Sequence, residues 1–340
     1  MYFASDNTAG AHPQVLKALV AANAGAVPAY GDDPYTAELQ ERLRTVFDHK
    51  DLVAFPIATG SAGNAQALAT LTPNWGAVYC HSEAHISVDE CGAPEVANPG
   101  SKLVTVDGKA GKIDADGIKA KIRGRDFVHA VQPATVSITN LTEVGTAYGQ
   151  SEIADLGAFC RAENLSFHLD GARFANALAS VNTPPADMSW RAGVDALTFG
   201  ATKNGCIAAE VVIFFDPSKA EEFAFRRKRA GHLFSKMRFL SAQVLGYLQD
   251  DLWLETARHA NTMATRLAKG LTAAGCSPYF SVDGNMIFAP IPHPIQDRLR
   301  HAGAVFFPGR LSGTDGTDVR LVTAWSTTEA DVDKFVGLLG

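Results

Sequence analysis

The chain has 340 residues, 46% of them hydrophobic and 19% charged, and 30 basic against 36 acidic side chains give a net charge of −6. A chain of this size can bury a large core, and its length predicts one large domain with a smaller one beside it. The slightly acidic balance argues against a nucleic-acid partner, and the longest apolar runs are too short to cross a membrane.

The cysteines and the first residues indicate a cytoplasmic protein. Five cysteines are present, an odd number with no C-x-x-C spacing, so neither a disulfide framework nor a zinc ribbon is expected, and no metal site is predicted. The opening MYFASDNTAG lacks the basic and apolar regions of a secretory signal. We therefore expect a cytoplasmic location.

Short apolar runs alternate with helical patterns from about residue 35 to 215. The first helix, YTAELQERLRTVF, places Leu39, Leu43, Val46 and Phe47 on one face. The expected strands are LVAFPI (52–57), AVYC (77–80), LVTV (103–106), FVHAV (127–131), LSFHLD (165–170), DALTFG (195–200) and VVIFF (211–215). Helical stretches such as NAQALATL (64–71) and SEIADLGAFCRAEN (151–164) separate several of them. This alternation predicts an α/β fold of βαβ units on a mostly parallel sheet.

After Asp216 the pattern changes. One long basic helical stretch is predicted through RRKRAGHLFSKMRFLSAQVLGYL (226–248). A smaller α/β region follows from about Trp253, with strands near NMIFAPI (285–291) and DVRLVTAW (318–325). The expected division is an N-terminal arm and large domain over 1–250, and a small C-terminal domain over 251–340.

Three strand ends carry candidate functional residues, and ligands in open α/β sheets bind beyond the carboxyl ends of strands. TGSAGN (59–64) offers Gly60 and Ser61 at a helix start, where backbone N–H groups can bind a phosphate, although an ordinary glycine turn fits as well. HLDGAR (168–173) offers Asp170 and Arg173, which could equally be a helix cap and a surface ion pair. LTFGATKNG (197–205) offers Lys203, which alone would be interpreted as a solvated loop lysine.

Together these groups match the needs of one cofactor. Pyridoxal 5′-phosphate requires a phosphate cradle, an acid beside its ring nitrogen and a lysine for the Schiff base. The acid keeps the ring nitrogen protonated, so that the ring can accept electrons. The order cradle, Asp170, Lys203 is that of fold type I pyridoxal phosphate enzymes, which have a large domain with a mostly parallel sheet and a small C-terminal α/β domain.

Several motifs in the same order resemble the L-threonine aldolase family, within the wider β-eliminating lyase group. They are SDNT, AYGDDPYT, TGSAGN, HLDGAR, FGATKNG and VRLVTAWSTTEADVD, and they run through almost the whole chain. CHSEAHISVDECGAPE, QPATVSIT, RRKRAGHLFSKMRFLSAQ and DDLWL look closer to the phenylserine aldolase branch, which cleaves aryl β-hydroxy amino acids. The resemblance implies a carbon–carbon lyase that releases glycine and an aldehyde.

The resemblance also implies roles for single residues near the cofactor. His85 matches a histidine stacked on the cofactor ring, and it or a water that it positions would serve as the base for the β-hydroxyl proton. Ser5 and Arg320 match positions that bind the substrate carboxylate, a task that suits the planar guanidinium. Arg173 would share this carboxylate or contact the cofactor.

Two further matches imply a homodimer or homotetramer with shared active sites. Tyr30 and Arg238 match residues that reach a neighbouring subunit's site, Tyr30 toward the substrate and Arg238 toward the cofactor phosphate. From the pattern alone, the basic cluster of 226–238 would be interpreted as a solvated helix face.

One departure from the family concerns a second active-site histidine. Typical threonine aldolases carry Asn-Thr-His after the strand that precedes the Asp170 strand, whereas VQPATVSITNLTEVGT here has no histidine between His129 and His168. Gln132, Ser137 or Thr139 could fill the space, and a larger β-substituent could be accommodated.

The predicted function is a pyridoxal phosphate aldolase acting on L-β-hydroxy-α-amino acids of the threonine or phenylserine type. The alternatives are another fold type I enzyme, a β-eliminating lyase or transaminase, or a non-catalytic pyridoxal-binding protein. The intact lysine, acid and arginine argue against the last of these.

Overall fold

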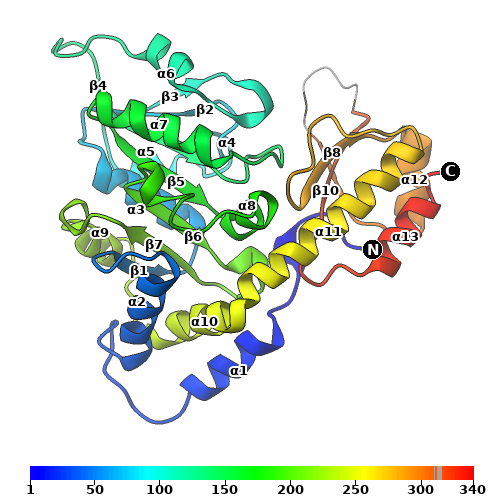
Figure 1. Ribbon diagram of the computed structural model, residues 1–340, viewed down its shortest axis with the longest axis horizontal. Helices are drawn as coiled ribbons and strands as arrows, with labels where there is room; N and C mark the ends of the chain where they lie inside the picture. The colour runs from blue at the N-terminus through cyan, green and yellow to red at the C-terminus, as the bar shows by residue number, and fades with distance from the viewer. Residues whose placement is uncertain (310, 312–315) are drawn as a thin grey trace.

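A seven-stranded sheet forms the centre of the larger part of the molecule (Figure 1). The computed structural model describes residues 1–309, 311 and 316–340. The strands are β1 (Val53–Ile57), β2 (Gly76–His81), β3 (Lys102–Val106), β4 (Gln132–Thr139), β5 (Ser166–Gly171), β6 (Ala196–Gly200) and β7 (Glu210–Phe214). Their order is β1-β7-β6-β5-β4-β2-β3; β7 pairs antiparallel with β1 and with β6, and all the other pairs are parallel. The predicted mostly parallel α/β sheet is confirmed.

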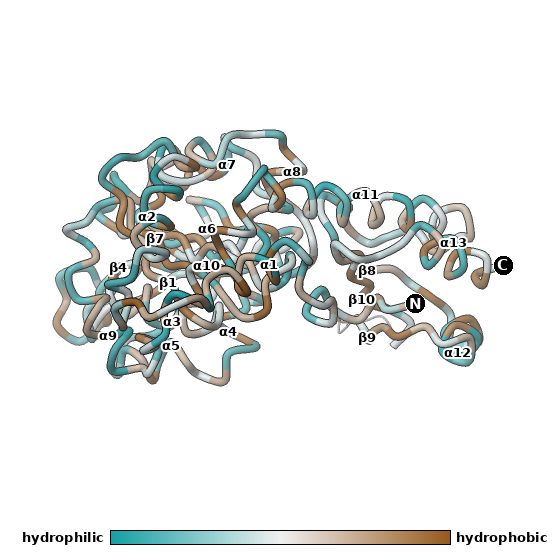
Figure 2. Tube along the Cα trace, turned by 90° about the horizontal axis from the view of Figure 1, so that it is seen from below, coloured by the Kyte–Doolittle hydropathy of each residue, from teal (hydrophilic) through white to brown (hydrophobic). Residues whose placement is uncertain are grey.

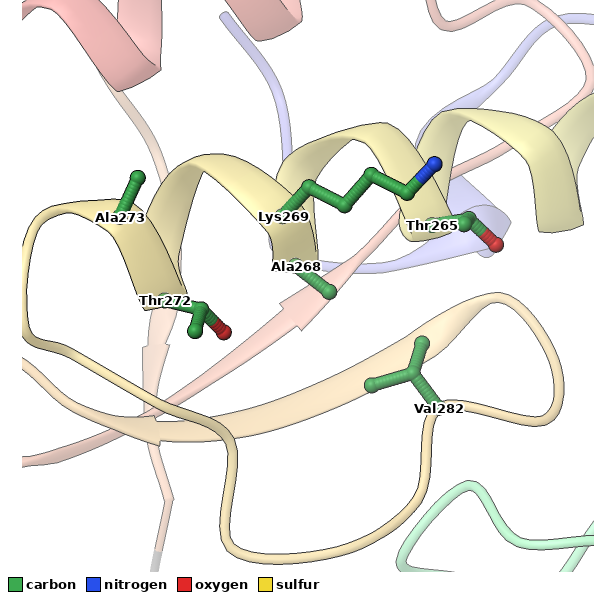
Figure 3. A pocket seen from close by; sticks show the side chains of 6 residues that line it. All are labelled: Thr265, Ala268, Lys269, Thr272, Ala273 and Val282. Atoms are coloured by element: carbon green, nitrogen blue, oxygen red, sulfur yellow. The ribbon is translucent and has the colours of Figure 1, made fainter.

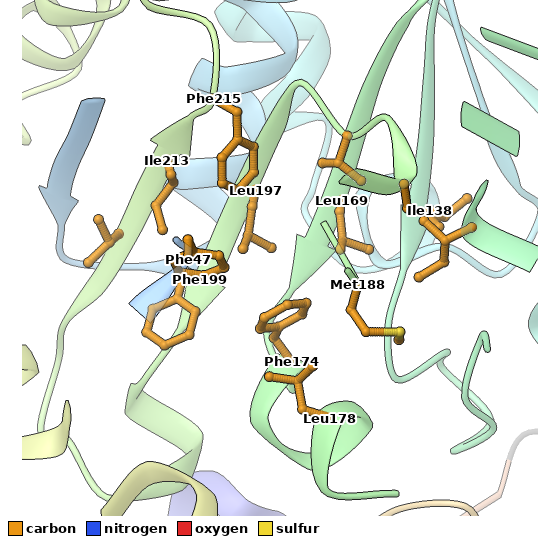
Figure 4. Packing of buried hydrophobic residues seen from close by; sticks show 14 of the residues in the cluster. Phe47, Ile138, Leu169, Phe174, Leu178, Met188, Leu197, Phe199, Ile213 and Phe215 are labelled. Atoms are coloured by element: carbon orange, nitrogen blue, oxygen red, sulfur yellow. The ribbon is translucent and has the colours of Figure 1, made fainter. Parts of the chain in front are cut away.

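Helices cover both faces of this sheet, which is why its central strands are apolar on both sides. The helices before β7 are α1 (Pro13–Ala22), α2 (Pro34–Val46), α3 (Gly60–Leu71), α4 (His85–Val88), α5 (Ala93–Ala97), α6 (Ala115–Lys121), α7 (Gln150–Ala162) and α8 (Phe174–Val181). One core joins α2, α7, α8 and α10 (Arg238–Leu248) to the sheet, with Phe47, Phe174 and Phe199 in mutual ring contact (Figure 4). The opposite face packs against α3 and α9 (Phe223–Arg229).

A smaller lobe holds the second sheet and both chain termini (Figure 2). Its strands are β8 (Met286–Pro290), β9 (Phe307–Pro308) and β10 (Asp318–Val322), antiparallel in the order β8-β10-β9, and its helices are α12 (His293–His301) and α13 (Glu329–Gly337). The long helix α11 (Leu252–Ala273) links the lobes, because Trp253 and Ala257 belong to the core of the large sheet and Met263 to that of the small one. The predicted domain division at residue 250 stays a prediction.

Two sequence predictions are wrong in detail. The run 127–131 is not a strand: Phe127 and Val128 are exposed in a turn, and the strand begins afterwards at Gln132. The basic stretch 226–248 is not one helix, because α9 ends at Arg229 and Gly231 adopts a positive φ of 77° before α10 begins. A left-handed residue is incompatible with a continuing helix, and glycine adopts it at low cost.

Candidate active site

The predicted site residues from four parts of the chain converge at one edge of the large sheet. The carboxyl ends of the parallel strands meet there, and the registers pair Thr139 with Asp170 and both Ile57 and Gly200 with Glu210. Helix α3 begins after β1, α4 after β2 and the Lys203 turn after β6. The edge is the position that doubly wound sheets use for ligands.

The amino terminus of α3 is an open helix end. Thr59 caps it by accepting a hydrogen bond from the Ala62 N–H at 3.3 Å, and Gly60 and Ser61 form the first turn. A Cβ built on Gly60 meets no atom within 4 Å, so an anion can approach this backbone closely. First-turn N–H groups have no partner inside the helix and bind phosphate well. The predicted phosphate cradle therefore has suitable geometry.

Asp170 is buried at the end of β5 with its carboxylate held from two sides. The Ala172 N–H donates to Oδ1 at 2.9 Å, and the Asn64 side-chain amide donates to Oδ2 at 2.7 Å. These donors fix the carboxylate and leave further acceptor capacity on its oxygens. A protonated ring nitrogen is a group that could use it.

Lys203 lies in a 3₁₀ turn, Thr202–Asn204, directly after β6, and is half-buried. The turn is anchored on both sides: Glu210 accepts the Ala201 N–H at 2.7 Å, and Asn204 donates to the Tyr247 hydroxyl at 2.7 Å and to the Trp253 carbonyl at 2.8 Å. Lysine side chains are mostly solvent-exposed, so a half-buried lysine in an anchored turn is a candidate functional residue. Its ammonium interacts electrostatically with Asp6, His85 and Glu210, which places it among the other candidate residues.

His85 begins α4, and two carboxylates hold it. Its Nδ1 lies 2.9 Å from Glu90 Oε1, and its backbone N–H donates to Glu143 Oε1 at 2.8 Å. The hydrogen bond with Glu90 raises the pKa of His85 above its usual value, against burial, which lowers it, and the nearby Asp170 adds to the increase. Asp170 also acts on Glu143, so His85, Glu143 and Asp170 share one environment.

Arg173 and the N-terminal segment meet beside the lysine. Arg173 binds Asp6 with two hydrogen bonds, of 2.7 Å from Nε and 3.0 Å from Nη2. Burial would raise the pKa of Asp6, but Arg173 and Lys203 outweigh burial and lower it. Ser5 caps the short turn containing Asp6 by accepting the Asn7 N–H at 3.2 Å.

Arg320 lies on β10 in the small sheet, half-buried, with Nε 3.3 Å from the sulfur of Met286. Asn285, which precedes Met286, donates to Asp6 at 3.1 Å and thereby links this sheet to the Arg173 pair. The geometry is compatible with the predicted carboxylate role of Arg320, which stays a prediction.

Tyr30 and Arg238 lie elsewhere in the chain's own structure. Tyr30 is half exposed, with the Lys228 ammonium 4.8 Å from its ring centre, and Arg238 donates to the Gly25 carbonyl at 3.0 Å. Both belong to the region of α1, α2 and α10 (Figure 1). Their predicted roles require a second subunit and stay predictions.

The three residues proposed to replace a second histidine lie at different positions along β4. Gln132 is at the amino end, where it donates to the carbonyls of Gly124, Phe127 and Ala130. Ser137 is buried against His168, whose pKa burial lowers to about 4. Only Thr139 reaches the carboxyl end, and its hydroxyl donates to Glu143 at 2.7 Å.

Sequence reasoning missed five residues of this site. They are Asp6, Asn64, Glu90, Glu143 and Glu210. Asp6 and Asn64 stand inside the quoted motifs SDNT and TGSAGN, so the motifs carried a signal that single-residue reasoning overlooked. Burial, invisible in the sequence, raises the pKa of Glu143 and of Glu210 to about 7 in each case, although backbone N–H donors lower both.

Other parts of the described structure offer no competing site of this chemical kind. A groove of about 440 Å³ lies on the small lobe, lined by Thr265, Ala268, Lys269, Thr272, Ala273 and Val282 (Figure 3). It has one charged side chain and none of the residues above. Over residues 1–309, 311 and 316–340, no cluster of three histidine, cysteine or acidic residues could hold a metal, and no helix is long and apolar enough to cross a membrane.

Comparison with known proteins decides the family. The model of the beta-eliminating lyase family matches residues 2–291. The chain belongs to the beta-eliminating lyase family. The low specificity L-threonine aldolase of Pseudomonas sp. (strain NCIMB 10558) is 40% identical over 332 residues, 97% of this chain and 94% of that protein. Its counterpart in Pseudomonas aeruginosa is 41% identical over 326 residues, 96% of this chain and 93% of that protein.

Solved structures agree with this family. A threonine aldolase structure from Leishmania major covers 99% of this lyase at 30% identity, with 98% of its own chain and a TM-score of 0.94. Ureidoglycine–glyoxylate aminotransferase of Bacillus subtilis matches 99% of this chain and 91% of its own with a TM-score of 0.69 and 17% identity, which shows the fold alone. The predicted fold type I class and the threonine aldolase branch of the lyase family are confirmed.

Pyridoxal 5′-phosphate is the cofactor of this lyase family, and the residues present fit it. The open end of α3 at Gly60 suits its phosphate, the doubly held carboxylate of Asp170 suits its ring nitrogen, and the anchored turn brings Lys203 to the same edge.

Proposed function

We propose that this lyase cleaves L-β-hydroxy-α-amino acids between Cα and Cβ, releasing glycine and an aldehyde. The observation that carries the proposal is the convergence of Lys203, Asp170 and His85 at one sheet edge, in a chain 40% identical to a low specificity L-threonine aldolase. When bound, pyridoxal phosphate supplies an electron sink for the pair released by the broken bond.

Three elements would hold the cofactor. The first turn of α3, with Gly60 and Ser61, binds the phosphate through backbone N–H groups. Asp170 would accept a hydrogen bond from the protonated ring nitrogen, and its two existing donors keep the carboxylate in place. Lys203 provides the amine for the covalent link, from a turn that is anchored on both sides.

Orientation of the substrate is the task of its carboxylate-binding groups. Ser5 belongs to the N-terminal segment and Arg320 to the small sheet, and Arg173, which follows β5, is hydrogen-bonded to Asp6. Arginine binds a carboxylate through two parallel hydrogen bonds, which fixes rotation about Cα. Holding the carboxylate would thereby select which bond at Cα breaks, and the proposal requires this to be the Cα–Cβ bond.

The proton of the β-hydroxyl needs an acceptor as the Cα–Cβ bond breaks. His85 Nε2 is available for it, because Nδ1 is engaged by Glu90. This assignment makes His85 the base, either directly or through one water.

We further propose an aryl aldehyde as the preferred product, with L-phenylserine as the test substrate. The support is the phenylserine aldolase resemblance of the motifs and the absence of histidine from 130–167, where Thr139 and Glu143 reach the edge instead. A cytoplasmic homo-oligomer with Tyr30 and Arg238 serving a partner's site belongs to the same proposal.

The test is product analysis on the purified protein loaded with pyridoxal phosphate. L-phenylserine, L-threonine and L-alanine are supplied in turn, and aldehyde and glycine are quantified. Equal amounts of glycine and aldehyde, lost in Lys203→Ala, are expected, with benzaldehyde formed faster than acetaldehyde. Ammonia with a keto acid, or amino transfer from alanine, would contradict the aldolase assignment and favour elimination or transamination.

A further inference from the structure

Four side chains form a continuous hydrogen-bonded chain under the active-site edge. His85 Nδ1 lies 2.9 Å from Glu90 Oε1, Asn64 Nδ2 lies 3.0 Å from the same oxygen, and Asn64 Nδ2 lies 2.7 Å from Asp170 Oδ2. The side chain of Glu90 is fully buried, and Asn64 and Asp170 are 2% and 3% exposed. Burying a carboxylate costs folding free energy unless the group is paired, so the two buried acids depend on these hydrogen bonds.

The number of N–H donors on each side chain determines which groups donate and which accept hydrogen bonds in this network. An asparagine amide has two N–H bonds, and Asn64 directs its amide nitrogen at one carboxylate on each side. Each ionised carboxylate can only accept, so the proton between Glu90 and His85 belongs to Nδ1. In the neutral ring Nε2 then carries the free lone pair, which faces away from Glu90.

We propose that Glu90 and Asn64 are positioning residues: Glu90 holds His85 as the tautomer with a free Nε2, and Asn64 holds the Glu90 and Asp170 carboxylates as acceptors. Asn64 thereby joins His85 to Asp170, the acid proposed to hold the cofactor's ring nitrogen, in one network. Glu90 acts through His85, and Asn64 through Glu90 and Asp170. The roles of His85 and Asp170 in this inference rest on the proposed function.

Glu90 is the dominant influence among the charged groups that face His85. The groups are Asp89 and Glu90 directly after α4, Glu143 beyond β4, Asp170 on β5 and Lys203 after β6. Asp89 lies 3.8 Å from Nε2 with its side chain 65% exposed, so water screens it. The neighbouring Asp89 therefore provides a matched control for substitutions of Glu90.

The first test uses the cofactor-free protein. Glu90→Gln and Asp89→Asn each remove one carboxylate without changing shape, and the pKa of His85 is followed by NMR, with its signal assigned by loss in His85→Asn. Because Glu90 raises this pKa, Glu90→Gln should lower it by roughly 1 unit, whereas the exposed Asp89→Asn should change it by less than about 0.3 unit. An unchanged value in folded Glu90→Gln overturns the role of Glu90.

The second test uses the loaded enzyme over a range of pH. Glu90→Gln should move the acidic limb of kcat/KM to lower pH by the same amount and lower its plateau about 10-fold or more, because a less basic, less oriented imidazole accepts the proton poorly. Asp89→Asn should retain the wild-type profile. Overlapping profiles for wild type and Glu90→Gln contradict the proposal, while inactivity of the wild type on every β-hydroxy amino acid contradicts the proposed function instead.

Asn64→Ser provides a variant that does not depend on Glu90→Gln folding. Loss of the bridging amide frees Asp170, so the dissociation constant of pyridoxal phosphate should rise about 3- to 10-fold, as for one lost hydrogen bond. Glu90→Gln, which leaves the Asp170 contact in place, should bind the cofactor nearly as wild type does. Equal cofactor affinity in Asn64→Ser and wild type would remove Asn64 from the network.

Discussion

At the residue scale, the kind of donor decides how each buried acid titrates. Asp6 is contacted by the charged Arg173 and by Lys203, and its pKa is lowered in spite of burial. The carboxyl groups of Glu143 and Glu210 are also buried, but they accept hydrogen bonds mainly from neutral groups. Burial therefore raises the pKa of each to about 7. Neutral hydrogen bonds thus compensate less of the desolvation cost than a full positive charge does.

The raised pKa of Glu143 predicts pH-dependent stability. A carboxyl group whose pKa is higher in the folded state than its usual 4.5 stabilises below that value, and this contribution is lost as pH rises toward about 7. Glu143→Gln, which cannot ionise, should therefore be neutral near pH 4 and stabilising at pH 8. The side chain is only partly buried, so screening reduces the gain to about 1–2 kcal/mol.

Urea unfolding of cofactor-free Glu143→Gln and wild type at pH 4.5 and pH 8 measures this difference. The midpoints should separate only at the higher pH, with the variant the more stable. The same separation at both pH values would show that Glu143 does not titrate with a raised pKa.

Lys203 and Asp170 became candidates only in combination, because each of them alone has an ordinary structural interpretation. Their roles stay predictions, and the structure places Asp170 at the end of β5 and Lys203 in the turn after β6. Glu90 lies inside the motif CHSEAHISVDECGAPE and Glu143 inside VQPATVSITNLTEVGT, but nothing in either stretch distinguishes them from ordinary surface acids. Their positions depend on how α4 and the 140–143 segment cross the sheet edge, which only the fold determines.

At the element scale, α3 connects the sheet to the site, and one glycine permits its close approach. A Cβ on Gly63 would lie 2.8 Å from the Thr198 methyl on β6 and 3.3 Å from the Val212 methyl on β7. Both neighbours are β-branched and buried, so they have little freedom to move. The approach brings Asn64, the next residue, within reach of Asp170 and Glu90.

Gly63→Ala should therefore destabilise the protein by about 1–3 kcal/mol through overpacking, although alanine is the better helix former by about 1 kcal/mol. Gly337→Ala in α13 is the matched control, because its Cβ would meet nothing within 4 Å. Thermal unfolding should show a lower midpoint for Gly63→Ala and an unchanged or higher one for the control. Equal midpoints for Gly63→Ala and wild type would mean that α3 can move away at no cost.

Element prediction failed where local pattern and tertiary context disagree. The apolar run 127–131 has the composition of a strand, yet the Gln132 side chain organises it into a turn at the sheet's edge. The stretch 226–248 has helical periodicity throughout, yet Gly231 and the non-helical residues 232–236, of which 234–236 are exposed, divide it. Strands from β5 to β7 were predicted well because burial on both faces produces long apolar runs.

At the scale of the whole molecule, the candidate site draws residues from two lobes and from distant parts of the chain. Phe3 is buried in the small lobe's core, and its backbone bonds Val305 and Val322, so Ser5 and Asp6 enter the site from that lobe. Helix α11 contributes to both cores. Such non-local assembly was not predictable from motif order, which gives the sequence of the site's parts but not their contacts.

The most direct test of the account is to locate the covalent link to the cofactor. The intact protein is loaded with pyridoxal phosphate, reduced with borohydride, digested and examined by peptide mass spectrometry. We expect one modified residue, Lys203, in the turn that follows β6, and no stable modification in Lys203→Ala. A label on another lysine, or full aldolase activity in Lys203→Ala, would contradict it.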